Sequence, residues 1–290
     1  MPVHSAKQRI KNAVYRGVGA VGRLRPMHTD GLRVLLYHKV NDADCNPGSV
    51  STALFAEHMA LVEADGYRPV ALDDVLAHLG SGAPLPPRAT LITFDDGYVD
   101  NLVGAAPVLQ RHGFPAVLFV SVGSIGSDTP FPHDERSGTP NPTLDWDGLA
   151  EIERAGVRVE SHGITHVRLA TLADDAAERQ LTESKRILED RLGRPICAYA
   201  YVKGGTADFD ERHRVMLRRA GYEAAFTTVT GSNRPGADPL ALKRYNVEPY
   251  PAATLSLVLR GACDALTVKD TRLGTDARRA FNRVLGTGSR

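Results

Sequence analysis

The chain has 290 residues, of which 42% are hydrophobic and 24% are charged, and its formal net charge is +1. A chain of this length and composition can bury the core of one large α/β domain without dividing in two. Nucleic-acid binders usually carry a strongly basic face, so the near-neutral charge predicts no nucleic acid among the partners. The three cysteines are far apart and odd in number, which is typical of thiols in a reducing compartment.

The first thirty residues alternate basic with apolar side chains at spacings of three and four, which suggests a basic amphipathic helix. Arg16 interrupts the apolar run and no clear small-residue cleavage site follows, so the segment suits neither a secretory signal nor a membrane span. We therefore expect a cytoplasmic protein. Residues 1–26 either make a peripheral contact with the inner face of the membrane or pack on the domain as a frayed lead-in, since glycines weaken the helix.

From residue 33 onward, short apolar runs alternate with amphipathic stretches, which is the pattern of a largely parallel sheet or barrel. The expected strands cover residues 33–37, 89–94, 116–120, 157–160, 196–201, 224–228 and 242–247. The expected helices cover residues 54–64, 72–79, 101–111, 146–155, 174–192 and 210–220. We predict a basic N-terminal segment at 1–30, one catalytic domain at 31–263 and a fraying tail at 264–290.

One long stretch, residues 123–142, is too polar for a strand and too broken by Gly and Pro for a helix. We expect it to be a surface loop. Loops of this length within a compact domain are often lids or binding loops, so this one either shapes a substrate groove or is a solvated connector.

The first group of residues with chemical potential is Thr-Phe-Asp-Asp-Gly, from Thr93 to Gly97, where an apolar strand ends in two carboxylates. Barrel enzymes place their catalytic residues at strand ends. Neighbouring side chains on an extended backbone point in different directions, so Asp95 and Asp96 can have different roles, one binding a cation and the other accepting a proton. The alternative is structural, because Asp is also a favoured residue at a helix N-cap.

The second group is Ser-His-Gly-Ile-Thr-His, from Ser161 to His166, which follows another expected strand. Two imidazoles four residues apart can reach one cation. With a carboxylate they form a site that leaves coordination positions open for water and substrate, as a hydrolytic metal requires. The alternative is that both histidines are solvated or hydrogen-bonded structural residues.

Together these two groups resemble the first two motifs of the polysaccharide deacetylases, also called the NodB-homology domain or carbohydrate esterase family 4, and the likeness extends over residues 32–261. The resemblance implies an α/β fold, a distorted (β/α) barrel. It also implies that Asp95 is the general base, that Asp96, His162 and His166 hold a metal, and that the reaction removes an N-acetyl group from an amino sugar.

A third segment, Leu-Leu-Tyr-His-Lys-Val, ends an expected strand at His38. A histidine in this position is usually structural. In the branch that resembles exopolysaccharide poly-N-acetylglucosamine deacetylases, however, the chain order is permuted and a Tyr-His on the first strand replaces a C-terminal histidine. No histidine follows His213 here. The resemblance therefore implies that His38 is the general acid.

The fourth segment, from Cys197 to Gly205, corresponds to a family loop that presents a backbone N–H to the developing oxyanion. Tyr201 is implied in that role. The family usually has proline where this chain has Ala200, a change that relaxes the backbone without removing any N–H. Arg244 also fits the family, as a structural or substrate-side residue.

These resemblances imply a metal-dependent hydrolase. Zinc suits a carboxylate and two imidazoles, although ligand type does not exclude iron, cobalt or nickel. The implied substrate is an N-acetylated amino-sugar glycan or a lipid-linked or nucleotide-linked precursor. Two alternatives stay open: a catalytically silent member that binds glycan or serves as a scaffold, and an amidohydrolase that acts on a non-sugar amide.

Overall fold

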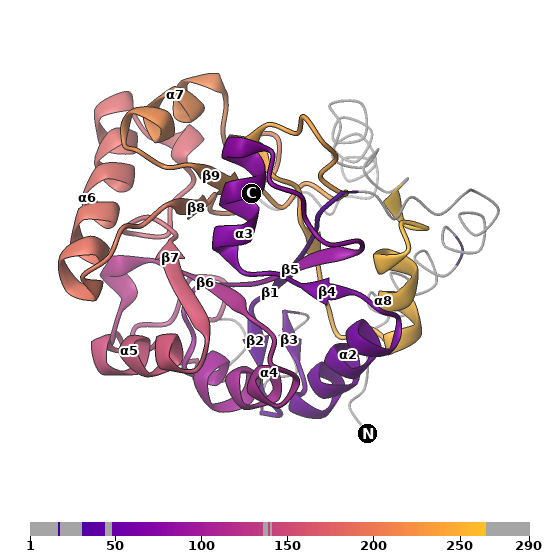
Figure 1. The fold of residues 1–290 in the computed structure, drawn as a ribbon. Helices are drawn as coiled ribbons and strands as arrows, with labels where there is room; N and C mark the ends of the chain where they lie inside the picture. Colours follow the sequence, from indigo (N-terminus) through magenta and orange to yellow (C-terminus); the bar gives the residue numbers. More distant parts are fainter. Residues whose placement is uncertain (1–16, 18–30, 44–47, 136–138, 140, 265–290) are drawn as a thin grey trace, which may run out of the picture.

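The computed structural model describes residues 17, 31–43, 48–135, 139 and 141–264, and its centre is a curled parallel sheet surrounded by helices (Figure 1). Nearly all of the expected N-terminal helix and of the expected tail lies outside the described residues, as does Cys45. The expected domain boundaries therefore stay predictions. Within the described part of the chain, no helix is long and apolar enough to cross a membrane.

The main sheet has eight strands, in the order β10-β1-β5-β6-β7-β8-β9 with β4 beside β5, and every pair is parallel. Its longer strands are almost fully buried, as apolar strands covered on both faces should be. The strands are β1 (Arg33–Tyr37), β4 (Arg68–Pro69), β5 (Ala89–Asp95), β6 (Ala116–Val120), β7 (Val157–Ser161), β8 (Ala198–Ala200), β9 (Ala224–Phe226) and β10 (Tyr245–Asn246). A separate pair consists of β2 (Lys39–Val40) and β3 (Ser49–Val50).

The segment 242–246 joins the two edges of the curled sheet. Leu242 pairs with Phe226 of β9, and three residues later Tyr245 pairs with Leu35 of β1. Between these pairings the Arg244 N–H donates to Val229 O, which interrupts the ladder of hydrogen bonds along this segment. As a result β10 is shorter than the expected strand 242–247. This changeover distorts the barrel and confirms the predicted fold class.

The expected helices are all present, with shifted ends. They are α2 (Thr52–Ala64), α3 (Leu72–Ser81), α4 (Ala106–His112), α5 (Trp146–Arg154), α6 (Asp174–Leu192) and α7 (Glu211–Arg219). Residues 101–105, expected as the first turns of one helix, form a π-helical turn, η1 (Asn101–Ala105). At this turn Gly104 approaches Val40 O so closely that a Cβ would lie 2.2 Å from it. A further helix, α8 (Ala252–Leu259), was not predicted.

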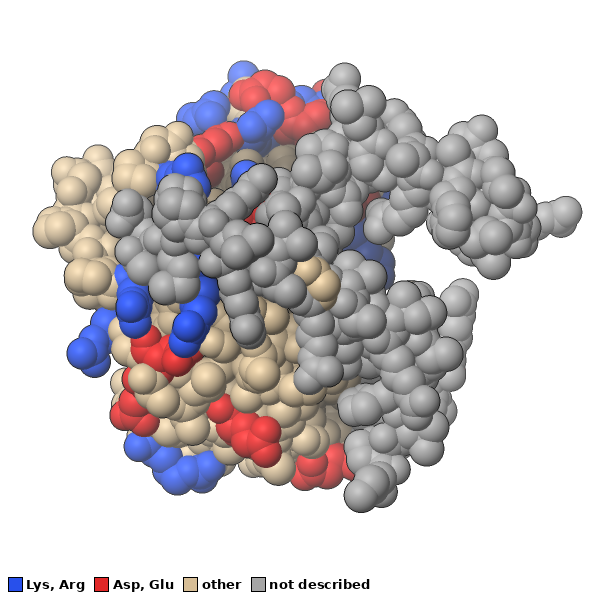
Figure 2. Space-filling model, turned by 90° about the vertical axis from the view of Figure 1, so that its right-hand side faces the viewer, with Lys and Arg blue, Asp and Glu red and all other residues tan. Residues whose placement is uncertain are grey.

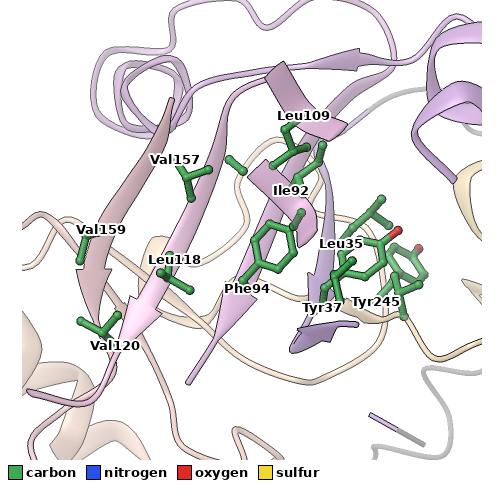
Figure 3. Packing of buried hydrophobic residues seen from close by; sticks show 14 of the residues in the cluster. Leu35, Tyr37, Ile92, Phe94, Leu109, Leu118, Val120, Val157, Val159 and Tyr245 are labelled. Carbon is green, nitrogen blue, oxygen red and sulfur yellow. The ribbon is translucent and has the colours of Figure 1, made fainter. Parts of the chain in front are cut away.

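Alternation along the strands divides the core into two clusters. Ile92 and Phe94 of β5 belong to the outer cluster, between the sheet and its surrounding helices, together with Leu118 and Val120 of β6 (Figure 3). The intervening side chains point into the barrel. There the rings of Phe119 and of Phe226, which belong to non-adjacent strands, lie 5.3 Å apart across the curl.

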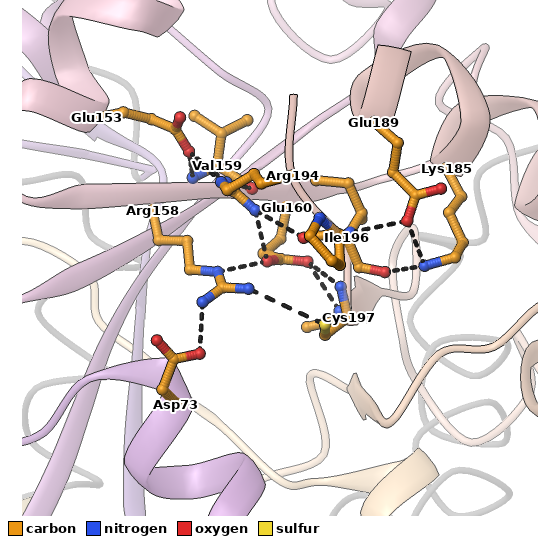
Figure 4. A network of polar contacts seen from close by, with 12 residues as sticks. Asp73, Glu153, Arg158, Val159, Glu160, Lys185, Glu189, Arg194, Ile196 and Cys197 are labelled. Atoms are coloured by element: carbon orange, nitrogen blue, oxygen red, sulfur yellow. Dashed lines mark hydrogen bonds and ion pairs between the residues drawn. The ribbon is translucent and has the colours of Figure 1, made fainter. Parts of the chain in front are cut away.

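A buried carboxylate inside the barrel, that of Glu160, connects β7 to β8 through hydrogen bonds. Glu160 of β7 accepts hydrogen bonds from Arg158, Arg194 and the backbone N–H groups of Cys197 and Ala198 (Figure 4). The N–H groups of Ile196 and Cys197 bond to the carboxylates of Glu189 and Glu160, and β8 begins at Ala198 rather than at 196 as expected. Arg158 also pairs with Asp73 of α3, which packs inside the curl.

On the face shown in Figure 2, the acidic and basic side chains of the described residues are interspersed among uncharged ones, and no large patch of one charge sign is visible. This distribution agrees with the near-neutral net charge of the chain.

Candidate active site

A cavity of about 300 Å³ lies where β1, β5 and β7 end, which is where parallel barrels place their functional residues. It is lined by all five side chains for which we predicted catalytic or metal-binding roles: His38, Asp95, Asp96, His162 and His166. It is also lined by side chains that sequence reasoning did not single out, including Lys39, Tyr98, His133, Lys203 and Glu248.

Asp95 is held by an arginine from the far end of the chain. Thr93 and Asp95 both face the barrel interior, because they alternate with outward-facing Phe94. Arg244 Nη1 and Nη2 each donate a 2.7 Å hydrogen bond to Asp95, and its Nε donates to Thr227 O. Burial raises the pKa of Asp95, but the charge and hydrogen bonds of Arg244 outweigh burial and lower it overall. Asp95 is therefore a carboxylate at neutral pH.

Asp96, His162 and His166 bring three ligand atoms to within 4.8 Å of one another. Asp96 Oδ1 lies 3.6 Å from His162 Nε2 and 3.0 Å from His166 Nε2. Asp96 and His166 have φ values of +78° and +51°, which residues other than glycine rarely adopt. Such conformations cost free energy and cluster at functional sites, so the local geometry indicates function at both residues.

The backbone orients His162, which directly follows β7. Its Nδ1 lies 2.8 Å from Ala200 O, and since a carbonyl only accepts hydrogen bonds, Nδ1 carries the proton and Nε2 presents a lone pair to the cavity. Burial lowers the pKa of His162 to about 4, so its imidazole is neutral at pH 7, as a metal ligand must be. The residue at 200 thus contributes its carbonyl, whatever its side chain.

The three side chains fit a divalent cation. Asp96 Oδ1 is buried, and within the described residues no hydrogen bond of suitable geometry reaches it. A buried carboxylate oxygen without a partner is costly, whereas a cation between this oxygen and the two imidazole nitrogens would satisfy it. Two imidazoles and one carboxylate also leave coordination positions open for water and substrate.

His38 reaches the same cavity from the first strand. It lies between β1 and β2, half-buried, and its backbone carbonyl accepts a 2.8 Å hydrogen bond from Asn101 of the π-helical turn. Burial lowers the pKa of the His38 imidazole, although the charges of Asp96 and Asp95 act in the opposite direction. The predicted acid and the predicted base therefore line one cavity.

The loop after β8 differs from expectation at Tyr201. The Tyr201 N–H donates to Phe226 O at 3.0 Å and its hydroxyl donates to Leu240 O, so this N–H is already engaged in the sheet. The part of this loop that lines the cavity is Lys203, two residues later, with a φ of +61°. A backbone donor to an oxyanion from this loop has to come from after Tyr201.

The described part of the stretch 123–142 is a loop that starts with the single turn η2 (Val122–Ser124), as predicted. It contributes to the cavity through His133, whose neighbour Asp134 forms a buried ion pair with Lys39. Composition identified the loop, but nothing in its sequence showed which of its polar side chains faces the predicted metal ligands. The position of His133 depends on the contact of its neighbour Asp134 with Lys39, which lies 95 residues earlier in the sequence.

Comparison with known proteins agrees with this geometry. Residues 82–225 match the family model described as polysaccharide deacetylase. The chain is 27% identical over 218 residues to Bacillus subtilis YxkH, which is provisionally named a polysaccharide deacetylase. The matched region is 75% of this chain and 72% of YxkH. The chain is 32% identical over 148 residues to the Escherichia coli poly-beta-1,6-N-acetyl-D-glucosamine N-deacetylase. The matched region is 48% of this chain but 21% of that protein.

Solved structures show the same fold. IcaB from Ammonifex degensii aligns with a TM-score of 0.69 at 24% identity, over 80% of this chain and 97% of that one. The Streptococcus pyogenes deacetylase PplD, solved with acetate, aligns with a TM-score of 0.68 at 21% identity, over 80% of this chain and 99% of that one.

Proposed function

Because the domain that holds this cavity belongs to the polysaccharide deacetylase family, we propose that the chain is a metal-dependent hydrolase that removes N-acetyl groups from an amino sugar in a polysaccharide. The observation that carries this proposal is the convergence of Asp96, His162 and His166 on one point, beside an arginine-held Asp95 and His38.

The side chains divide the reaction among them. Asp96, His162 and His166 would hold a divalent cation, which would supply Lewis-acid polarisation and lower the pKa of water. Asp95, kept ionised by Arg244, accepts the proton of the attacking water. His38 donates a proton to the departing amine, and the nearby charges of Asp96 and Asp95 favour the protonated form that this step requires, against the burial that lowers its pKa.

The substrate class follows from the relatives. The likeness to the Escherichia coli deacetylase supports a β-1,6-linked N-acetylglucosamine polymer as the first substrate to test, with lipid-linked and nucleotide-linked precursors as the alternatives. Mass spectrometry should detect the loss of one acetyl group per reacted sugar from such oligomers. Asp95→Asn should slow the loss by about 10²-fold or more, while Asp175→Asn, on the exposed face of α6, should leave its rate unchanged.

The outcomes separate the alternative functions. Loss of acetyl from simple N-acetyl amides, but from no sugar, would make the chain a non-sugar amidohydrolase. Metal uptake with no acetyl loss from any of these compounds would favour a silent glycan-binding or scaffold protein.

For the metal itself we propose zinc, on the basis of two imidazoles and one carboxylate. Elemental analysis of protein purified without added metal should give about one zinc per chain, and the double variant His162→Ala/His166→Ala should give none. Iron, cobalt or nickel at that stoichiometry would correct the metal without changing the site. Full zinc occupancy in the double variant would show that the two histidines are structural.

We further propose that the protein acts in the cytoplasm, at the inner face of the membrane, on the basis of the basic residues of segment 1–26. The full chain should sediment with anionic vesicles at low salt and lose this binding at high salt, because the attraction is electrostatic. If deletion of residues 1–26 leaves sedimentation unchanged, the segment is not the membrane contact.

A further inference from the structure

The loop between β6 and α5 brings a third histidine to the metal ligands. The ring of His133 stacks on Phe131 at 5.4 Å, and Phe131 in turn lies 4.7 Å from the ring of His166. His133 Nε2 lies 3.4 Å from Asp96 Oδ2. It is not one of the three side chains whose ligand atoms lie within 4.8 Å of one another. His133 therefore faces the ligand set from outside.

The hydrogen bonds around His133 determine which of its atoms carries the proton. Lys39 Nζ donates to Asp134 Oδ1 at 2.7 Å, and Tyr98 Oη donates to Asp134 Oδ2 at 2.6 Å. Tyrosine has a single hydroxyl proton, and here it points to a carboxylate that only accepts. Toward His133 Nε2, which lies 2.9 Å away, Tyr98 Oη can therefore only accept, so Nε2 carries a proton.

The same N–H is shared with the outer oxygen of Asp96, because His133 Nε2 lies 2.9 Å from Tyr98 Oη and 3.4 Å from Asp96 Oδ2. The two oxygens of this carboxylate have different surroundings, because Oδ1 faces the imidazoles of His162 and His166 whereas Oδ2 faces His133. Asp96 is 2% exposed, so bulk water solvates little of its carboxylate. A donor at Oδ2 offsets part of the cost of burying the carboxylate and limits its rotation.

We propose that His133 is a positioning residue of the metal site, whose Nε2–H holds Oδ2 of Asp96 so that Oδ1 is presented to the cation. Asp134, fixed by its buried ion pair with Lys39, and Tyr98 hold the imidazole in place. The inference rests on the metal site of the proposed function and adds to it a residue from the loop 123–142.

The test is metal affinity rather than activity. Full-length protein is stripped with a chelator and titrated with Zn²⁺ against a chromogenic competitor. His133→Ala should weaken zinc binding about 10- to 100-fold, the usual scale for loss of an outer partner of a ligand, and still bind one ion per chain. His133→Gln should recover most of the affinity, because its side-chain N–H can take the position of Nε2–H.

Two further variants serve as controls. Tyr98→Phe removes the acceptor that orients the ring and should weaken binding in the same direction, but less than His133→Ala. His112→Ala, on α4 and paired with Glu63 instead, should leave zinc affinity unchanged. Circular dichroism of each stripped variant shows that the comparison is made between folded proteins.

Zinc affinity of His133→Ala within twofold of the parent protein would overturn the inference while leaving the proposed function intact. With Co²⁺ as the probe, the visible spectrum of His133→Ala should keep the parent's band positions, since an outer partner is not a ligand. Shifted bands that glutamine does not restore would make His133 a direct ligand and also overturn it. If the parent chain binds neither ion, the metal site of the proposed function fails with it.

Discussion

Arg244 and Asp95 form a buried bidentate pair, with two hydrogen bonds of 2.7 Å between residues 149 positions apart in the sequence. Arg244 is fully buried and Asp95 is 3% exposed, so bulk water solvates neither charge appreciably. The pair joins the segment that bridges the sheet edges to the strand that carries the carboxylates. It therefore links closure of the barrel to the residues for which we propose catalytic roles.

Removal of one partner of this pair should be costly. Arg244→Met leaves the Asp95 carboxylate buried without its cation and should lower the free energy of unfolding by about 3–5 kcal/mol. The double variant Arg244→Met/Asp95→Asn removes both charges and should recover part of that loss. Urea denaturation of the two single variants and the double variant measures the coupling. Additive losses would show that the two residues contribute independently.

The adjacent carboxylates should respond differently to metal. Asp95→Asn cannot accept a proton, so it should bind metal normally and lose about 10²-fold or more in turnover. Asp96→Asn should weaken metal binding first, and part of its activity should return at high metal concentration. Turnover measured across a metal titration decides between the roles. Rescue of Asp95→Asn by metal, with none for Asp96→Asn, would mean that the two roles are exchanged.

The proposed acid role of His38 predicts a dependence on the leaving group. His38→Ala should lose about 10²-fold or more in turnover on an N-acetyl amide, because an amine leaves only after protonation. On an acetyl ester with a phenoxide leaving group the defect should shrink, since a phenoxide departs unprotonated. Equal losses of kcat/KM on the amide and the ester would argue against proton donation.

His58 should make the metal-free protein less stable in acid. Burial lowers the pKa of this histidine from 6.5 to about 4. Its two ring nitrogens form hydrogen bonds with Tyr37 Oη and Tyr250 O. Between these two values the unfolded chain binds more protons than the folded one, so stability falls as pH drops from about 6.5 to about 4. His58 contributes on the order of 3 kcal/mol to this loss.

The comparison that isolates this contribution uses His58→Gln, which does not titrate in that window. Urea denaturation at several pH values, with chelator present, should give a shallower dependence on pH for the variant by about one proton. A dependence on pH identical to that of the parent chain would place the acid sensitivity elsewhere, for example at His162, whose pKa is also lowered to about 4 by burial.

Local sequence was sufficient to predict much of this protein. The apolar strand that ends in Asp95 and Asp96, and the pair His162 and His166 four residues apart, are contiguous patterns whose chemistry depends on spacing. Because the carboxyl ends of parallel strands meet at one end of a barrel, the fold class alone implies that these residues share a cavity, together with His38.

Tertiary structure decided what depends on pairing between distant segments. The strand expected at 242–247 changes partner midway, and only that changeover directs Arg244 to Asp95. The Tyr201 N–H is taken by Phe226 on the neighbouring strand, which no local pattern reveals.

The loop 123–142 was recognisable by composition, but the position of His133 beside Asp96 follows from the pair of Asp134 with Lys39, from another part of the chain. Spacing along the sequence determines which side chains one strand end or one loop presents. Which of them meet across the cavity is determined by long-range packing and burial, because a buried charge is stable only where the fold supplies its partner.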